Sequence, residues 1–178
     1  MTAFVALLRA VNVGGTGKLA MSDLKAICEA AGLERVRTYI ASGNVVFRTD
    51  RAEAAVKAAI EAGLLAHAGK PVGVQVRTAA EMTAVLDANP FPERAPNRTV
   101  AVFLDAAPPA DALERATGLN GEAMRLGRRE IYVHYGDGMA DSKLKIPVAA
   151  AGTARNMNTI AKLAEMAREL VEGDAPWA

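Results

Sequence analysis

The segment FVALLRAVNVGGTGK, residues 4–18, passes from an apolar run through one arginine and one asparagine into a glycine-rich loop. A short apolar run that ends in turn-forming residues is typical of a strand buried on both faces. Closely spaced glycines let backbone N–H groups turn toward a ligand, because no Cβ stands in the way. The segment therefore predicts a buried strand, Arg9 at the end of that strand, and a loop suited to an anion.

The glycine loop does not match the two best-known phosphate-binding patterns. A Walker loop that ends at Gly17-Lys18 would need a glycine where Asn12 stands and a hydroxyl residue where Leu19 stands. The β-α-β-β order of the surrounding elements is also not that of a dinucleotide-binding unit. Two interpretations stay open, an anion-binding nest of backbone N–H groups and a surface loop without a ligand.

The composition indicates a folded protein with a sizeable core. Of the 178 residues, 51% are hydrophobic, which is too many for a disordered chain. The formal net charge of +1 and the aromatic content of 4% argue against a dedicated nucleic-acid binder. Such domains usually carry a basic excess and aromatic side chains that stack on bases. Nucleic acid is therefore a possible partner that we do not favour.

Few residues could form a disulfide or a metal site. Cys28 is the single cysteine, so no intrachain disulfide can form, and its place on the apolar face of a helix predicts a core position. His67 and His134 are the only histidines, which argues against a zinc site of Cys and His; a magnesium ion held by carboxylates lies outside this argument. We predict no metal site, and the sequence indicates no particular cofactor.

The sequence also favours a cytoplasmic protein. No apolar run approaches the length of a membrane-spanning helix, and the N-terminus lacks the pattern of a secretory signal. One cysteine fits a reducing compartment. We expect no contact with a membrane, and the sequence does not indicate the oligomeric state.

Hydrophobic periodicity predicts alternating strands and helices. We expect Ser22 to cap a first helix and Asp50 to begin a second one, with strands at residues 36–40 and 44–48 joined as a hairpin. A short helix around Leu113 is expected in the second half. The other expected elements are a strand with Val72, Val74 and Val76 on one face, a helix after Thr78, strands at 99–104, 122–126 and 131–135, and a last helix from about 156–158 to Gly173.

The element order predicts an α+β fold of two ferredoxin-like halves in tandem, with a C-terminal helix. We expect a first half at residues 1–89, a proline-rich linker at 90–98 and a second half at 99–178. In the split βαβ plan the first and third strands are antiparallel neighbours at the centre of the sheet. This neighbourhood would place Arg9 and Asn12 beside the turn that follows the second strand.

A second polar cluster precedes the last helix. It contains Ser142 and Lys143, followed by Arg155, Asn156 and Asn158. A helix N-terminus attracts anions through its free N–H groups and its dipole. Taken singly, these residues are better explained as a helix cap and surface side chains, whereas the group as a whole favours a ligand site.

Four motifs resemble those of the bacterial family called domain of unknown function 1697. They are RAVNVGG at 9–15, TYIASGNVVF at 38–47, SKL at 142–144 and TARNMNT at 153–159, where the family usually has RGINVGG, TYIQSGNVVF, SKL and TTRNWNT. The resemblance implies an α+β fold of two ferredoxin-like halves and no established activity. The chain departs from the family pattern at Ala10, Ala154 and Met157; the last replaces a tryptophan and argues against base stacking there.

These patterns together predict a small anionic ligand, a phosphorylated molecule or a nucleotide, in a cationic polar cleft. No catalytic residue is assigned. Two alternatives stay open: an enzyme of phosphoryl or nucleotidyl transfer or of hydrolysis, in which Lys143 and Arg155 would stabilise developing charge, and an interaction module for nucleic acid or protein. The predicted ligand-binding residues are Arg9, Asn12, Ser42 and Asn44 on one wall of the cleft, Lys143, Arg155, Asn156 and Asn158 on the other wall, and in addition Gly14, Gly15 and Ser142.

Overall fold

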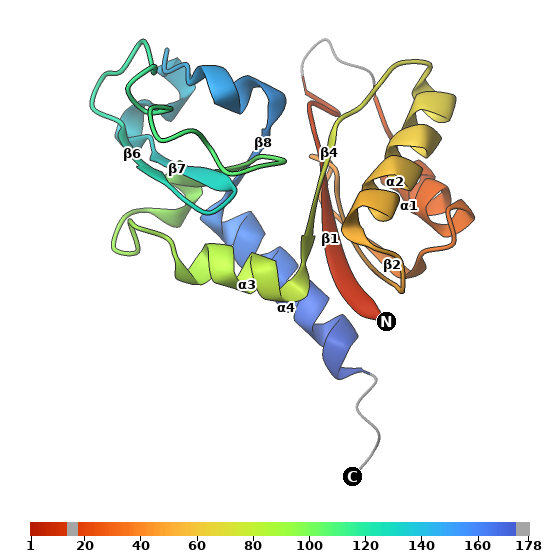
Figure 1. Ribbon diagram of the computed structural model, residues 1–178. Coiled ribbons are helices and arrows are strands. Elements are labelled where there is room, and N and C mark those ends of the chain that lie inside the picture. Colours follow the sequence, from red (N-terminus) through yellow and green to blue (C-terminus); the bar gives the residue numbers. More distant parts are fainter. Residues whose placement is uncertain (14–17, 174–178) are drawn as a thin grey trace. The chain divides into compact units, whose positions relative to one another are not determined.

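The computed structural model describes residues 1–13 and 18–173, and the predicted ligand residues Gly14 and Gly15 lie outside these ranges. The chain forms two compact units (Figure 1). Within the described ranges, the first unit consists of residues 1–82 and 162–173, and the second unit of Thr83–Ala161. Each unit contains a four-stranded antiparallel sheet.

The first sheet has the strand order β2-β3-β1-β4, with two helices on one face. Its elements are β1 (Thr2–Leu8), α1 (Met21–Ala30), β2 (Glu34–Tyr39), β3 (Asn44–Thr49), α2 (Glu53–Ala68) and β4 (Val74–Thr78). Figure 1 shows α1 and α2 on the same side of this sheet. They bury alternate residues of every strand, such as Phe4, Phe47 and Val76, against Leu24 of α1 and Ile60 of α2.

The second sheet repeats this strand order as β6-β7-β5-β8. Its strands are β5 (Thr99–Phe103), β6 (Ala123–Leu126), β7 (Glu130–His134) and β8 (Thr153–Asn156), accompanied by α3 (Ala79–Asp87), α4 (Met157–Glu172) and 3-10 turns at Pro96–Arg98, Gly136–Asp141 and Pro147–Ala151. Two antiparallel sheets with helices confirm the predicted α+β class, and the shared strand order is that of the split βαβ plan.

The two sheets also correspond in the position of a buried arginine. In the first, Val5 of β1 lies opposite Val46 and Arg77; in the second, Ala101 of β5 lies opposite Tyr132 and Arg155. Each of these arginines donates a hydrogen bond of 2.9 Å from Nη1 to the carbonyl oxygen of the preceding residue. This match, strand for strand, supports the predicted internal repeat.

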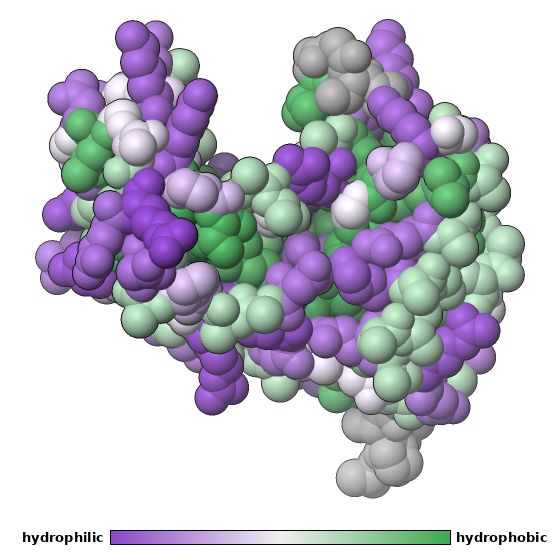
Figure 2. Space-filling view, turned by 45° about the horizontal axis from the view of Figure 1, so that its top comes forward, coloured by the Kyte–Doolittle hydropathy of each residue, from purple (hydrophilic) through white to green (hydrophobic). Residues whose placement is uncertain are grey.

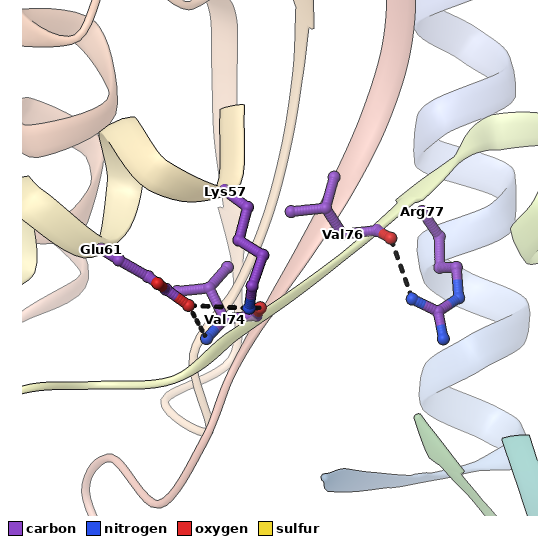
Figure 3. A network of polar contacts seen from close by, with 5 residues as sticks. All are labelled: Lys57, Glu61, Val74, Val76 and Arg77. Carbon is purple, nitrogen blue, oxygen red and sulfur yellow. Dashed lines mark hydrogen bonds and ion pairs between the residues drawn. The ribbon is translucent and has the colours of Figure 1, made fainter. Parts of the chain in front are cut away.

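Both faces of the first sheet are buried. The alternation of apolar and polar residues in β4 predicts instead that only one face is buried. Gln75 and Arg77 point away from the α1–α2 side, yet their exposed fractions are only 5% and 1%. Figure 3 shows Arg77 on the side of β4 opposite to α2. The portion of α4 that belongs to the first unit bonds to this same face, since Arg37 of β2 donates to Glu169 over 3.1 Å.

The free edge of β4 is closed by side chains of α2, as Figure 3 shows. Glu61 Oε1 accepts hydrogen bonds from Lys57 Nζ over 2.7 Å and from Val74 N over 3.1 Å. Lys57 Nζ also donates to Val74 O over 2.5 Å. Because the backbone groups of Val74 have partners within the unit, this end of the edge strand is a poor template for another strand.

Three local predictions are wrong. Helix α1 begins at Met21 after an extended Ala20, so Ser22 lies within the helix and does not cap it. Helix α2 has Ala52, and not Asp50, at its N-cap position. Instead of a helix around Leu113, the described chain between β5 and β6 forms successive turns. After these turns Thr117 forms an isolated antiparallel bridge with Lys145, in which each backbone N–H donates to the other residue's carbonyl oxygen over 2.9 Å.

The boundary between the two units passes through α3, after Met82, and through α4, after Ala161. Both helices therefore contribute residues to both units. The domain boundary at residues 90–98 stays a prediction. In the ranges that the structure describes, no helix is long and apolar enough to cross a membrane.

Candidate functional site

The first and third strands are neighbours, as predicted, so the residues at their ends meet. Leu7 lies opposite Asn44, and Leu8 N donates to Gly43 O over 2.8 Å. The end of β1 and the β2–β3 turn thus form one end of the first sheet. Arg9 is exposed there, and its backbone N–H donates to Gly73 O over 2.9 Å, beside the start of β4.

Asn12 holds the β1–α1 connection in place. Its Oδ1 accepts from Leu19 N over 2.7 Å, and its Nδ2 donates to Leu19 O and to Ala41 O, both over 2.8 Å. The backbone of Asn12 has a φ of +54°, a left-handed conformation that asparagine tolerates better than most residues. Asn12 therefore links Leu19, just before α1, to Ala41 of the β2–β3 turn.

Asn44 and Ser42 shape that turn. Asn44 is fully buried, and its Nδ2 donates to Tyr39 O and to Ser42 Oγ, both over 2.9 Å. Gly43 between them has a φ of +90°, and a Cβ there would lie 2.6 Å from Val11 Cγ2, so only glycine fits. The hydrogen bonds described here for Ser42 and Asn44 are structural, and a ligand role for these residues stays a prediction.

A hollow of about 170 Å³ opens beside the β1–α1 connection. The connection contributes Ala10, Val11, Lys18 and Leu19; the end of α2 contributes Leu64, His67 and Ala68; and the segment before β4 contributes Lys70 and Val72. Three of these nine residues can carry positive charge, namely Lys18, His67 and Lys70. All lining residues belong to the first unit.

The electrostatics of the hollow have contributions of both signs. Its two lysines are exposed, and α1 begins two residues after Leu19 with no side-chain cap among the described residues, which leaves a positive helix end nearby. Asp23 in the first turn of α1 opposes this charge, and its Oδ2 lies 3.8 Å from His67 Nε2. Lys18 and Lys70 then remain as the basic groups best placed for an anion.

The predicted ligand residues include none of the three basic residues of the hollow, Lys18, His67 and Lys70. His67 lies in the last turn of α2, and Lys70 follows Gly69, which ends the helix in a left-handed conformation with a φ of +72°. Basic residues at a helix C-terminus are common, because they complement the helix dipole. His67 and Lys70 line the same hollow as Lys18 because the chain after α2 runs back to pair with β1 as strand β4.

In the second unit, Ser142 binds a carboxylate of the same chain. Ser142 Oγ donates to Glu122 Oε1 over 2.6 Å and accepts from Leu144 N over 3.3 Å. The hydroxyl, followed by the backbone N–H of Asn120, holds the pKa of Glu122 below its ordinary value. Lys143 is exposed on the following turn.

Arg155 and Asn156 are integrated into β8 and the start of α4. Arg155 is 8% exposed and donates from Nη1 to Thr153 Oγ1 over 2.7 Å; burial lowers its pKa to about 10. Asn156 Oδ1 accepts from Thr159 N over 2.9 Å, so the N-cap contact that the sequence left open between Asn156 and Asn158 is made by Asn156. Asn158 is exposed in the first turn of α4.

The described part of the chain contains one cysteine, and its possible metal ligands do not form clusters. Cys28 is fully buried, as predicted, and burial with nearby Glu29 raises the pKa of its thiol to about 12, so it is neither accessible nor ionised at neutral pH. Residues 1–13 and 18–173 hold no group of three or more His, Cys, Asp or Glu side chains that could bind a metal ion.

Comparisons with known proteins agree with the fold. The model of a family described as "Protein of unknown function (DUF1697)" matches residues 1–132. The chain is also similar to a conserved bacterial protein, SP0830 from Streptococcus pneumoniae, at 25% identity and a TM-score of 0.77, over 93% of this chain and 98% of that one. No curated protein matches the sequence.

Proposed function

The chain belongs to the DUF1697 family, whose description assigns no activity, and we propose from the site itself that the first unit binds a small anionic ligand, such as a phosphorylated metabolite. The observation that carries this proposal is the hollow whose wall bears Lys18, His67 and Lys70. Basic side chains at the rim of a hollow offer an anion charge-assisted hydrogen bonds.

The position of Lys18 favours an anion over a neutral ligand. It directly follows the glycine-rich segment and lies three positions before Met21, the first residue of α1. A lysine next to an uncapped helix N-terminus combines a mobile positive charge with fixed N–H donors. Lys70 adds a second charge from the segment that follows α2.

Asn12 and Asn44 take positioning roles in this proposal. Asn12 fixes both backbone groups of Leu19, the neighbour of Lys18. Asn44 shapes the β2–β3 turn through its hydrogen bond to Tyr39 O. Asn12 donates to Ala41 O in the same turn. These asparagines would hold the lysine at the hollow, so that less conformational entropy is lost when the ligand binds.

Calorimetric titration with inorganic phosphate, pyrophosphate and adenosine monophosphate tests the proposal. The double variant Lys18→Ala/Lys70→Ala should weaken binding about tenfold, because two exposed charge contacts are lost. Lys25→Ala is the matched control, since Lys25 is an exposed lysine of α1 that does not line the hollow.

Added salt should weaken binding in the wild type, since exposed charges are screened over about 8 Å at physiological ionic strength. Two results would contradict the proposal: none of the three anions binds, or one binds and the double variant retains the wild-type affinity.

A further inference from the structure

The wall of the hollow is chemically divided. Six of its nine residues are apolar, and they are Ala10, Val11, Leu19, Leu64, Ala68 and Val72. Val11, Leu19 and Leu64 are 5%, 7% and 1% exposed and belong to the hydrophobic core of the first unit. The floor of the hollow is therefore the edge of the core, and the basic groups lie around it.

A fully polar anion does not match such a wall. Inorganic phosphate carries oxygens in every direction, so those that face Leu64 and Val72 would lose water without gaining a hydrogen bond from these side chains. An anion with an apolar body can instead direct its charged group toward the lysines. Its body then covers the apolar surface of the wall that is in contact with water, which belongs mainly to Ala10, Ala68 and Val72.

We infer that the ligand of this site is an amphipathic anion, a phosphate monoester or carboxylate with a compact apolar body of about ring size, whose charged group lies at Lys18 and Lys70 and whose body lies against Leu64 and Val72. The inference rests on the proposed anion site and specifies its ligand. The volume of about 170 Å³ sets the size of the body, because an apolar cavity of about 150 Å³ is known to accommodate benzene.

The surface around the hollow supports a small ligand rather than a docked protein segment. Figure 2 shows weakly hydrophobic residues over the helical side of the first unit, at the right of the view, which agrees with the alanine-rich sequence of α2. Of the large apolar residues of α2, Leu65 is 48% exposed, whereas Val56, Ile60 and Leu64 are buried. Leu65 lies outside the lining of the hollow, so the apolar wall offered to a ligand there is that of the six residues named above.

The experiment compares methyl, butyl and phenyl phosphate with inorganic phosphate by calorimetric titration of the whole protein. Each added methylene should strengthen binding up to about fourfold while it is being buried, and phenyl phosphate should bind at least about tenfold more tightly than inorganic phosphate. Butylamine, which has the same body with a positive charge, should not bind.

Val72→Thr is the diagnostic variant. It keeps the shape of a half-buried side chain but places a hydroxyl on the apolar wall. In this variant the ratio of the affinity for butyl phosphate to the affinity for methyl phosphate should fall about threefold or more. The affinity for inorganic phosphate should stay unchanged. Lys25→Ala should leave the whole series as in the wild type.

Failure of this inference differs from failure of the proposed anion site. If inorganic, methyl and butyl phosphate bind equally and all depend on Lys18, the amphipathic ligand is refuted and the anion site stands. If neither phosphate nor its esters bind, both are refuted. If a folded Val72→Thr protein still prefers butyl over methyl phosphate as strongly as the wild type does, the apolar body of the ligand does not lie against this wall.

Discussion

Replacement of Asn12 isolates the contact that closes the β1–α1 connection. Asn12→Gly removes three hydrogen bonds of 2.7 to 2.8 Å but permits the φ of +54°. At about 1 kcal/mol net for each bond, the free energy of unfolding should fall by about 2–3 kcal/mol, since part of the site is exposed. Asn12→Ala should lose about 1 kcal/mol more, because Ala disfavours the left-handed conformation.

Urea denaturation at 25 °C measures both variants, with Asn158→Ala as the control at an exposed asparagine of α4. The control should stay within about 0.5 kcal/mol of the wild type. Hydrogen exchange gives a local readout. The N–H of Leu19 donates a hydrogen bond to Asn12 Oδ1, so it should lose its protection from exchange in Asn12→Gly. The reasoning is refuted if Asn12→Gly unfolds with the wild-type free energy, or if the glycine and alanine variants are equally stable.

Three further predictions concern other parts of the chain. Ile40 is 49% exposed with a φ of +49°, so Ile40→Asn should raise the free energy of unfolding by about 0.5–1 kcal/mol in the same assay; a loss of stability would contradict the strain. Cys28 should resist a thiol reagent at pH 8 until the protein unfolds. Because folding raises the pKa of its thiol from 9.0 to about 12, the free energy of unfolding should fall as the pH rises through this range. Its modification in the native state would contradict the burial. Ser142→Ala should raise the pKa of Glu122 in an NMR titration, since Ser142 is the main cause of its lowered value; stability from Glu122 is then lost at a higher pH during acidification, and an unchanged pKa would refute the contact.

The element order was enough to predict the centre of the first sheet. The β-α-β-β-α-β succession requires the first and third strands to be neighbours, and the structure places Leu7 opposite Asn44. The α+β class and the core position of Cys28 were also predicted, and Asn156 was one of the two asparagines considered as the cap of the last helix. Each of these depends on local sequence or on a general rule of topology.

Other features depend on tertiary contacts that no local pattern encodes. Strand β8, Thr153–Asn156, is short and polar, and pairing with β5 makes it a strand. Arg77 resembles a solvent-facing residue of an alternating strand, but helices cover both faces of its sheet. His67 and Lys70 follow the usual pattern of a helix end, and only the folded chain brings them to Lys18.

The anion site is tested most directly by a chemical-shift map of the ¹⁵N-labelled protein during titration with inorganic phosphate. The account predicts saturable shifts at the backbone amides of Lys18, Leu19, His67, Lys70 and Val72, which line the hollow, and their loss in Lys18→Ala/Lys70→Ala. Shifts confined to the amides around Lys143 and Arg155, or no saturable shift in the first unit, would contradict it.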